Sequence, residues 1–217
     1  MLPKLPKTIL VTGFAPFGGE NINPSWQIVK ALPDMMAGCR VEKLFVPTEF
    51  GQSINVVTSA IDKLKPALIL CLGQAGGRAA MSVERIAINV NDACIADNAG
   101  AQPIDEAVVA EGPAAYFSTL PIKAMVAGLR AAGFPASVSQ TAGTFVCNHL
   151  FYGLQHALAG SAVRSGFMHI PYLPEQAAHK PGQPSLPLVT LVDGVRLALR
   201  LALETAQDLR LPGGATS

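Results

Sequence analysis

Short apolar runs that lead into glycine and alternate with helical stretches most constrain the fold of this 217-residue chain. Residues 8–12 (TILVT) run into Gly13, and residues 67–72 (ALILCL) run into a glycine-rich loop. Apolar runs of this length predict buried strands, and their alternation with helices predicts an α/β fold with a mainly parallel sheet. The expected strands cover residues 8–12, 40–46, 67–72, 82–90, 136–140 and 166–170, and the expected helices cover 24–32, 50–64, 122–132, 145–159 and 188–206.

The composition indicates one globular domain without affinity for nucleic acid or membrane. A chain with no repeat and no linker predicts a single domain over residues 1–217. Apolar residues make up 50% and charged residues 14%, which argues against disorder. The formal net charge of +1 provides no basic field to hold a nucleic acid. The best apolar run, residues 67–72, is far shorter than the roughly 20 residues that span a bilayer.

The N-terminal segment and the cysteines indicate the compartment. Residues 1–13 show neither a long apolar region nor a small-residue cleavage site, so we expect no signal peptide. The four cysteines form no C-x-x-C pair, and no histidine lies at metal-ligand spacing from them. We therefore expect a cytoplasmic protein with reduced thiols and no metal site.

The glycine-rich loops at 13–24 and 73–78 follow predicted strands, where sheets of this kind bind ligands. Their glycines do not spell G-x-G-x-x-G, and no G-K-[ST] follows, so neither a dinucleotide site nor a P-loop is supported. Phe14 and Phe17 lie in the first loop and suggest the apolar wall of a pocket. Packing of these rings for stability alone is the alternative.

Cys147 is the best candidate nucleophile because it stands where the segment TAGTFV becomes a helix. The helix dipole and the free N–H groups at this end are expected to lower the pKa of the thiol and favour thiolate. The same N–H groups could stabilise an oxyanion. A buried core cysteine is the alternative, and Cys39, Cys71 and Cys94 keep that interpretation, Cys71 most clearly because it lies inside an apolar strand.

His169 and Glu84 are the candidate partners of this thiol. His169 ends the strand GFMHI, so it should lie at the carboxyl edge of the sheet and can act as a general base. Glu84 interrupts an apolar alternation and is expected to share a face with Ile86, Ile88 and Val90, where a carboxylate needs a partner. The nucleophile–base–orienter set of covalent acyl transfer would follow. A structural histidine and a glutamate paired with an arginine are the alternatives.

The amino-acid sequences of seven segments resemble a known family. The segments are GFAPFGGENINPS (13–25), VPTEF (46–50), GQAGGR (73–78), SVERIAINVND (82–92), DNAGAQPID (97–105), GTFVCNHLFY (143–152) and MHIPYLPEQ (168–176). Together they strongly resemble pyroglutamyl peptidase of the cytosolic cysteine type, a thiol protease, over about residues 8–206.

The resemblance implies an open three-layer α/β/α sandwich that removes an N-terminal pyroglutamyl residue from peptides without metal or cofactor. The family's catalytic residues fall on Cys147, His169 and Glu84. The lactam pocket and its surroundings are implied at Phe14, Phe17, Asn23, Gln74, Phe145 and Val146. Asn23 is expected to brace the first loop, and backbone contacts to the ring are expected near Gln74. A homo-oligomer, dimer or tetramer, is also implied. Leu197 and Leu201 on the polar side of the last helix suggest burial under a loop or under another subunit, and the second agrees with it.

One departure from the family pattern concerns an arginine. Where members usually read D-D-A-R, this chain reads N-D-A-C, so that Cys94 replaces an arginine near the active site. A non-catalytic or weakly active member that binds pyroglutamyl peptides is therefore an alternative. A nucleoside-phosphorylase-like enzyme, which would share the layered fold but need phosphate-binding residues, is a second alternative.

Overall fold

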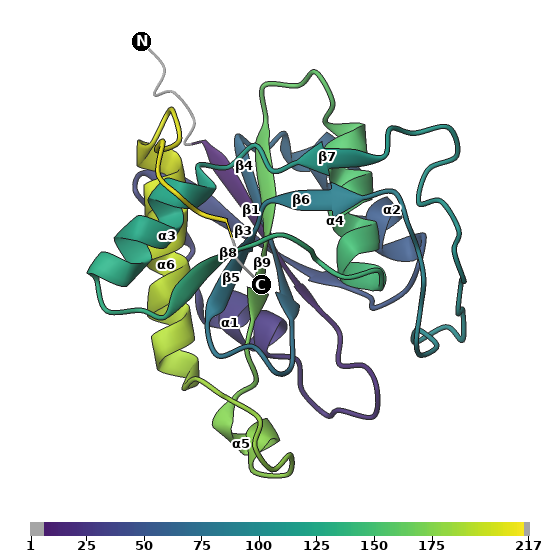
Figure 1. The fold of residues 1–217 in the computed structure, drawn as a ribbon. Coiled ribbons are helices and arrows are strands. Elements are labelled where there is room, and N and C mark those ends of the chain that lie inside the picture. The colour runs from purple at the N-terminus through teal and green to yellow at the C-terminus, as the bar shows by residue number, and fades with distance from the viewer. Residues whose placement is uncertain (1–6, 215–217) are drawn as a thin grey trace.

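The computed structural model, which describes residues 7–214, is an α/β/α sandwich around a seven-stranded sheet (Figure 1). The strand order is β2 (Met35–Met36), β3 (Cys39–Val46), β1 (Thr8–Phe14), β4 (Leu68–Gln74), β9 (Arg164–Ile170), β5 (Met81–Glu84) and β8 (Ala136–Ser139). Strands β3, β1, β4 and β9 run parallel, whereas β2 pairs antiparallel with β3 and β5 pairs antiparallel with β9. The predicted α/β class with a mainly parallel sheet is confirmed.

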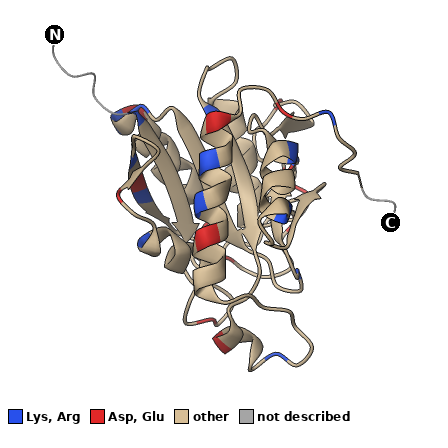
Figure 2. Cartoon of the chain, turned by 90° about the vertical axis from the view of Figure 1, so that its left-hand side faces the viewer, with Lys and Arg blue, Asp and Glu red and all other residues tan. Residues whose placement is uncertain are grey.

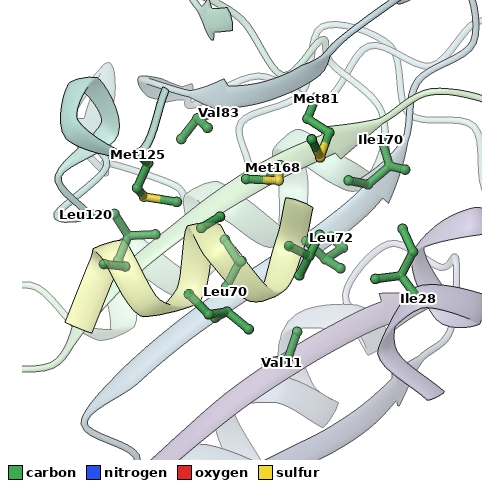
Figure 3. Packing of buried hydrophobic residues seen from close by; sticks show 14 of the residues in the cluster. Val11, Ile28, Leu70, Leu72, Met81, Val83, Leu120, Met125, Met168 and Ile170 are labelled. Atoms are coloured by element: carbon green, nitrogen blue, oxygen red, sulfur yellow. The ribbon is translucent and has the colours of Figure 1, made fainter. Parts of the chain in front are cut away.

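Helices cover both faces of this sheet. They are α1 (Pro24–Ala31), α2 (Gln52–Leu64), α3 (Ile122–Ala131), α4 (Val146–Ala157), α5 (Pro174–Ala177) and α6 (Leu188–Glu204). Side chains alternate along β4, so Leu70 packs with α1, α3 and α6 in the cluster of Figure 3, while Ile69 and Cys71 pack with α2 and α4 on the opposite face. Both clusters consist of fully buried apolar side chains, which accounts for the continuous apolar runs in the strands.

The expected strand over residues 82–90 is wrong as a single element. The chain leaves the main sheet at Arg85, and β6 (Ile86–Ile88) pairs with β7 (Ala115–Phe117) in a separate two-stranded sheet. The backbone N–H of Arg85 donates to Ser139 O and its carbonyl accepts from Ser118 N, both at 2.9 Å. Arg85 therefore bonds to segments next to both sheets, and this exchange of partners interrupts the alternation.

The break also changes which side chains share a face with Glu84. In β6 the buried residue is Ala87, while Ile86 and Ile88 are half-buried. Glu84 instead lies with Ser82 and Phe167 on the face covered by α4, because Ser82 pairs with His169 in the antiparallel register of β5 and β9. The candidate carboxylate thus faces the candidate histidine through sheet register.

Charged side chains are sparse, and Figure 2 shows several of them on the outer face of α6. Leu201 on that helix is half-buried, and a Cβ at Gly128 of α3 would come within 2.5 Å of it, so α3 covers it within the same chain. Leu201 therefore gives no support to an interface between subunits. Among the helices of residues 7–214, none combines the length and apolar character that crossing a membrane requires.

Gly13 at the end of β1 fixes how closely α1 approaches the sheet. A Cβ at Gly13 would lie 2.7 Å from backbone atoms of Ser25 and Trp26, and backbone cannot move aside as a flexible side chain can. We expect Gly13→Ala to lower the free energy of unfolding by about 1–3 kcal/mol in urea denaturation. Gly214→Ala is the control, since nothing lies within 4 Å of its Cβ position. Equal stability of the two variants would contradict this packing.

Candidate active site

His169 and Glu84 form a buried hydrogen-bonded pair between adjacent strands. His169 Nδ1 lies 2.7 Å from Glu84 Oε1, and the Glu84 side chain has no solvent exposure. Because β5 runs antiparallel to β9, Glu84 reaches the imidazole from deeper in the sheet. A carboxylate on Nδ1 holds the proton on that nitrogen and leaves Nε2 free to accept one. The structure thus brings together two of the three predicted catalytic residues.

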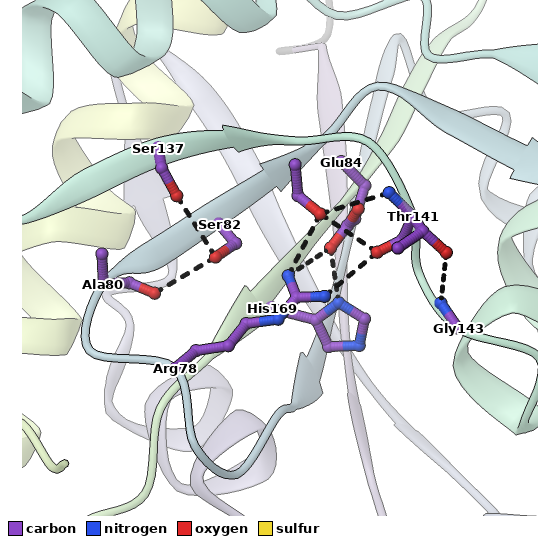
Figure 4. A network of polar contacts seen from close by, with 9 residues as sticks. Arg78, Ala80, Ser82, Glu84, Ser137, Thr141, Gly143 and His169 are labelled. Atoms are coloured by element: carbon purple, nitrogen blue, oxygen red, sulfur yellow. Dashed lines mark hydrogen bonds and ion pairs between the residues drawn. The ribbon is translucent and has the colours of Figure 1, made fainter. Parts of the chain in front are cut away.

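Arg78 completes the polar cluster around Glu84 (Figure 4). Its Nη1 lies 2.7 Å from Glu84 Oε1, and its Nη2 donates to Thr141 O at 3.0 Å. Ser139 Oγ accepts from Arg78 Nη1 at 3.3 Å and donates to Thr141 O at 3.0 Å. The predicted alternatives for Glu84, a histidine or an arginine partner, are therefore both present at one carboxylate oxygen.

Cys147 is the second residue of α4, in the first turn, where backbone N–H groups have no acceptor within the helix. A Cβ at Gly73 would lie 2.8 Å from Cys147 Sγ, so the thiol rests against β4 where that strand carries no side chain. Gly73 is the register partner of His169 in the β4–β9 pair. The thiol and the imidazole thus lie at the same end of adjacent strands.

The pKa values of this group follow from burial and from the charges of Glu84 and Arg78. Burial, with a smaller effect of the Glu84 charge, raises the pKa of Cys147 to about 12. Burial lowers the pKa of His169, against the raising effect of its bond to Glu84. The expected thiolate is therefore wrong for the free protein, because desolvation outweighs the helix dipole. The thiol is protonated and the imidazole is neutral at pH 7.

Asn148 and His149, which follow Cys147, fix the start of α4. Asn148 is fully buried; its Oδ1 accepts from Ile88 N at 3.0 Å and its Nδ2 donates to Ile88 O and Val90 O at 2.9 and 3.0 Å. His149 Nε2 accepts from Gly51 N at 2.8 Å, and its Nδ1 lies 3.0 Å from the side-chain oxygen of Asn91. Sequence reasoning excluded His149 as a partner of the thiol but did not find this anchoring role.

The aromatic residues predicted for the pocket divide into a buried and an accessible set. Phe14 is buried, 6.3 Å from the Phe167 ring, and Val146 is buried too. Phe17 and Phe145 are half-buried, with ring centroids 5.9 Å apart, and Phe145 stands two residues before Cys147. The accessible pair forms an apolar surface beside the thiol, whereas Phe14 packs beneath it.

Asn23 and Gln74 hold the loops that surround the thiol. Asn23 Oδ1 accepts from Ser25 N and Ser25 Oγ at 3.1 and 2.7 Å, and its Nδ2 donates to Ala15 O at 3.0 Å, so it caps α1 and ties the first loop. Gln74 Oε1 accepts from Gln176 Nε2 at 2.9 Å. The Asn23 side chain and the side-chain oxygen of Gln74 are thereby occupied by bonds within the protein.

Cys94 is exposed, so its interpretation as a buried core cysteine is wrong, and it lies in the long segment between β6 and β7. This segment is tied to the start of α4, because Thr144 Oγ1 donates to Asp92 O at 2.7 Å and Thr144 O accepts from Asp92 N at 3.0 Å. Within residues 7–214, no group of three His, Cys, Asp or Glu side chains could hold a metal ion.

This geometry defines a class of protein. An α/β/α sandwich that sets a thiol at a helix N-terminus, beside a histidine oriented by a carboxylate, has the construction of a cysteine peptidase. Comparison with known proteins narrows the class.

A family model described as pyroglutamyl peptidase matches residues 7–205. Pyrrolidone-carboxylate peptidase of Cupriavidus taiwanensis is 63% identical over 211 residues, 95% of this chain and 98% of that protein. Pyroglutamyl peptidase I from Bacillus amyloliquefaciens aligns with a TM-score of 0.92 at 45% identity, covering 95% of this chain and 100% of that one. Pyrrolidone carboxyl peptidase from Thermococcus litoralis aligns with a TM-score of 0.91 at 34% identity, covering 95% of this chain and 99% of that one. The chain belongs to the pyroglutamyl peptidase family, and the predicted enzyme class, a cysteine-type omega peptidase, is confirmed.

The anchoring role of His149 predicts a pH-dependent stability. Burial lowers its pKa to about 4, against about 6.5 in an unfolded chain. The unfolded state then binds more protons between pH 6.5 and pH 4, so the free energy of unfolding falls as the pH drops through this window, by up to about 3 kcal/mol.

We expect His149→Gln to be less stable at pH 7.5 and to lose part of this pH dependence in urea denaturation between pH 4 and 7.5. The comparison with wild type isolates His149, because the lowered pKa of His169 contributes to the pH dependence of both proteins alike. The exposed His179, replaced by Gln, is the control. A pH dependence of His149→Gln identical to that of wild type would contradict the assignment.

Proposed function

We propose that the chain hydrolyses the amide bond after an N-terminal L-pyroglutamyl residue of peptides, with Cys147 as nucleophile, His169 as base and Glu84 as the residue that orients it. The observation that carries the proposal is the 2.7 Å bond of His169 Nδ1 to a fully buried carboxylate, at the strand end against which the Cys147 thiol rests. The peptidases of the Cupriavidus and Bacillus species named above support the substrate class.

Acylation begins with proton transfer from the Cys147 thiol to His169 Nε2, because the free thiol is protonated. The sulfur forms a bond to the pyroglutamyl carbonyl carbon, and backbone N–H groups at the start of α4 stabilise the oxyanion. His169 then gives its proton to the leaving nitrogen as the C–N bond breaks. The products of this step are a thioester on Cys147 and a peptide with a free amino group.

Deacylation repeats the proton transfers with water as the nucleophile. His169 accepts a proton from water while the oxygen bonds to the thioester carbon, and it returns the proton to sulfur as the C–S bond breaks. Glu84 stabilises the imidazolium in both steps without taking its proton. Free pyroglutamate leaves, and the thiol and the neutral imidazole are restored.

The accessible aromatic pair, Phe17 and Phe145, suits a flat, uncharged lactam. With centroids 5.9 Å apart, the two rings form one apolar wall on which a five-membered ring can lie, while backbone groups near Gln74 read its N–H and C=O. Gln74 is bound to Gln176, which supports a role for its backbone rather than for its side chain. Phe14, Val146 and Asn23 then shape this pocket from behind.

Arg78 is proposed as a positioning residue that acts through Glu84. Its guanidinium fixes the carboxylate that orients His169, and its positive charge lowers the pKa of His169. A protonated His169 would place a second positive charge near Arg78, so Arg78 favours the neutral imidazole, which is the form that can accept the thiol proton.

Homo-oligomerisation as a dimer or tetramer and a cytoplasmic location remain predictions.

The test of the nucleophile is cleavage of a fluorogenic pyroglutamyl amide under reducing conditions. We expect Cys147→Ala to fold as wild type and to lose activity by a factor on the order of 10⁴ or more. Cys94→Ser, at an exposed thiol, is the control and should stay active. Activity in Cys147→Ala would refute the mechanism. If folded wild type does not cleave, binding of the amide without turnover, and its response to Cys94→Arg, would favour the non-catalytic alternative.

Replacement of Arg78 tests its action through Glu84. In Arg78→Met the buried Glu84 carboxylate loses its positive neighbour, so the pKa of His169 rises and the acid limb of kcat/KM moves to higher pH. We expect kcat/KM at pH 7 to fall about tenfold, the effect of one hydrogen bond to a charged group.

Arg85→Met is the matched control, because Arg85 donates to Gly213 O and not to Glu84. It should leave the acid limb where it is in wild type. A fall in the activity of Arg78→Met with an unmoved acid limb would show that Arg78 only supports the local fold.

A further inference from the structure

A cleft of ≈ 600 Å³ opens at the carboxyl end of the sheet, between the loop after β1 and the segment after β9. These two segments lie at the lower end of Figure 1. No step of the proposed mechanism uses most of its wall. Its lining includes Phe17, Gln74 and Ile95 near the loop after β1, and Tyr172, Lys180 and Gln183 on the segment after β9. The carboxylate of Glu20 also lines the cleft and pairs with Lys180. The first group is apolar apart from Gln74, whereas the second carries a paired ammonium, an amide and a phenol.

The first group of lining residues is continuous with the candidate nucleophile. Gln74 directly follows Gly73, against which Cys147 Sγ rests. The Phe17 ring lies 5.9 Å from that of Phe145, which precedes α4. The second group follows the base along the chain, because Tyr172 stands three residues after His169. A substrate bound at Cys147 can therefore extend directly into this cleft.

The chemistry of the substrate says which part of it can enter. A pyroglutamyl residue has its nitrogen closed into the lactam, so no residue precedes it and the rest of the peptide lies on the leaving side of the scissile bond. A cleft of this volume is in the range that holds drug-sized ligands, more than one five-membered ring requires. The space beyond the Phe17 end is therefore available to the leaving segment alone.

Lys180 and Glu20 are the charged side chains that line this space. Its Nζ lies 2.7 Å from Glu20 Oε1 and 5.5 Å from the centroid of the Tyr172 ring. Glu20 Oε2 accepts from Gln176 Nε2 at 3.2 Å, so both oxygens of this carboxylate are occupied. An ammonium has three donors, and Glu20 is the one carboxylate among the described residues that pairs with it. Lys180 thus retains hydrogen-bond donors for an acceptor in the cleft.

We infer that the Tyr172–Lys180–Gln183 end of the cleft binds the first residues of the leaving segment, and that Lys180 favours a carboxylate there. The inference rests on the proposed function. Two sources supply that carboxylate: an acidic side chain after pyroglutamate, or the C-terminus of a pyroglutamyl dipeptide. The bond to Glu20 raises the pKa of Lys180, so the ammonium stays charged throughout the neutral range.

The experiment measures kcat/KM for two substrate pairs that differ in one charge. Pyroglutamyl-alanine is compared with its amide, and pyroglutamyl-glutamate amide with pyroglutamyl-glutamine amide. We expect wild type to prefer one or both carboxylates about two- to fivefold, as for a partly exposed ion pair, and to lose this preference in high salt. The pair that shows the preference identifies the source.

Three variants test the assignment to Lys180. Lys180→Met should abolish or reverse the preference, because Glu20 then repels the carboxylate. Glu20→Gln should keep or strengthen it, since the ammonium loses a competing anion. Lys43→Met is the matched control: Lys43 also pairs with an acidic residue, Asp34, at 2.8 Å, and neither residue lines the cleft. This control should keep the ratio of wild type.

The outcomes separate this inference from the proposed function. If wild type cleaves the uncharged amides through Cys147 but shows no preference for either carboxylate, the inference is wrong and the proposed function stands. A preference that survives in Lys180→Met would also overturn it. If no pyroglutamyl substrate is cleaved by folded wild type, the proposed function itself fails.

Discussion

A single buried carboxylate organises this protein. Glu84 Oε1 accepts from both Arg78 and His169, and the side chain is closed to solvent. An unpaired carboxylate in such a place would take up a proton or destabilise the fold. Its partners come from three separate parts of the chain, namely the loop after β4, the end of β9 and, through Ser139 and Thr141, the segment that leads from β8 to α4. The residues of the candidate site therefore also hold these elements together.

The antiparallel direction of β5 makes this arrangement possible. A parallel β5 would carry its last residues to the carboxyl edge, where solvent reaches them. Running against β9, it leaves Glu84 beneath His169 and lets the chain cross at Arg85 into the small β6–β7 sheet. That sheet is bonded to α4 through Asn148, so the strand that carries Glu84 and the helix that carries Cys147 are held together. A shift of β5 by one residue would turn Glu84 to the opposite face.

Sequence reasoning found what strong local patterns encode. The apolar runs gave β1, β4 and β9, and the chemistry of helix starts and strand ends led to Cys147 and His169. Glu84 was predicted from an alternation that the structure interrupts at Arg85, so its pairing with His169 is present although the reasoning that led to it was wrong. The direction of β5, the pairing of Arg78 and the anchoring by His149 depend on contacts between distant segments, for which local periodicity carries no signal. The raised pKa of Cys147 likewise comes from tertiary burial.

The structure also shows what surrounds position 94, where the chain departs from the family pattern. Cys94 is exposed, and its neighbour Ile95 lines the cleft rather than the polar cluster around Glu84. The guanidinium that acts on the His169–Glu84 pair is supplied by Arg78, from another loop. Loss of an arginine at position 94 therefore leaves the acid–base groups intact and removes a charge beside the cleft. We therefore expect its consequence in substrate binding; if Lys180 contacts the leaving segment as we infer, its positive charge then carries more of the electrostatic discrimination.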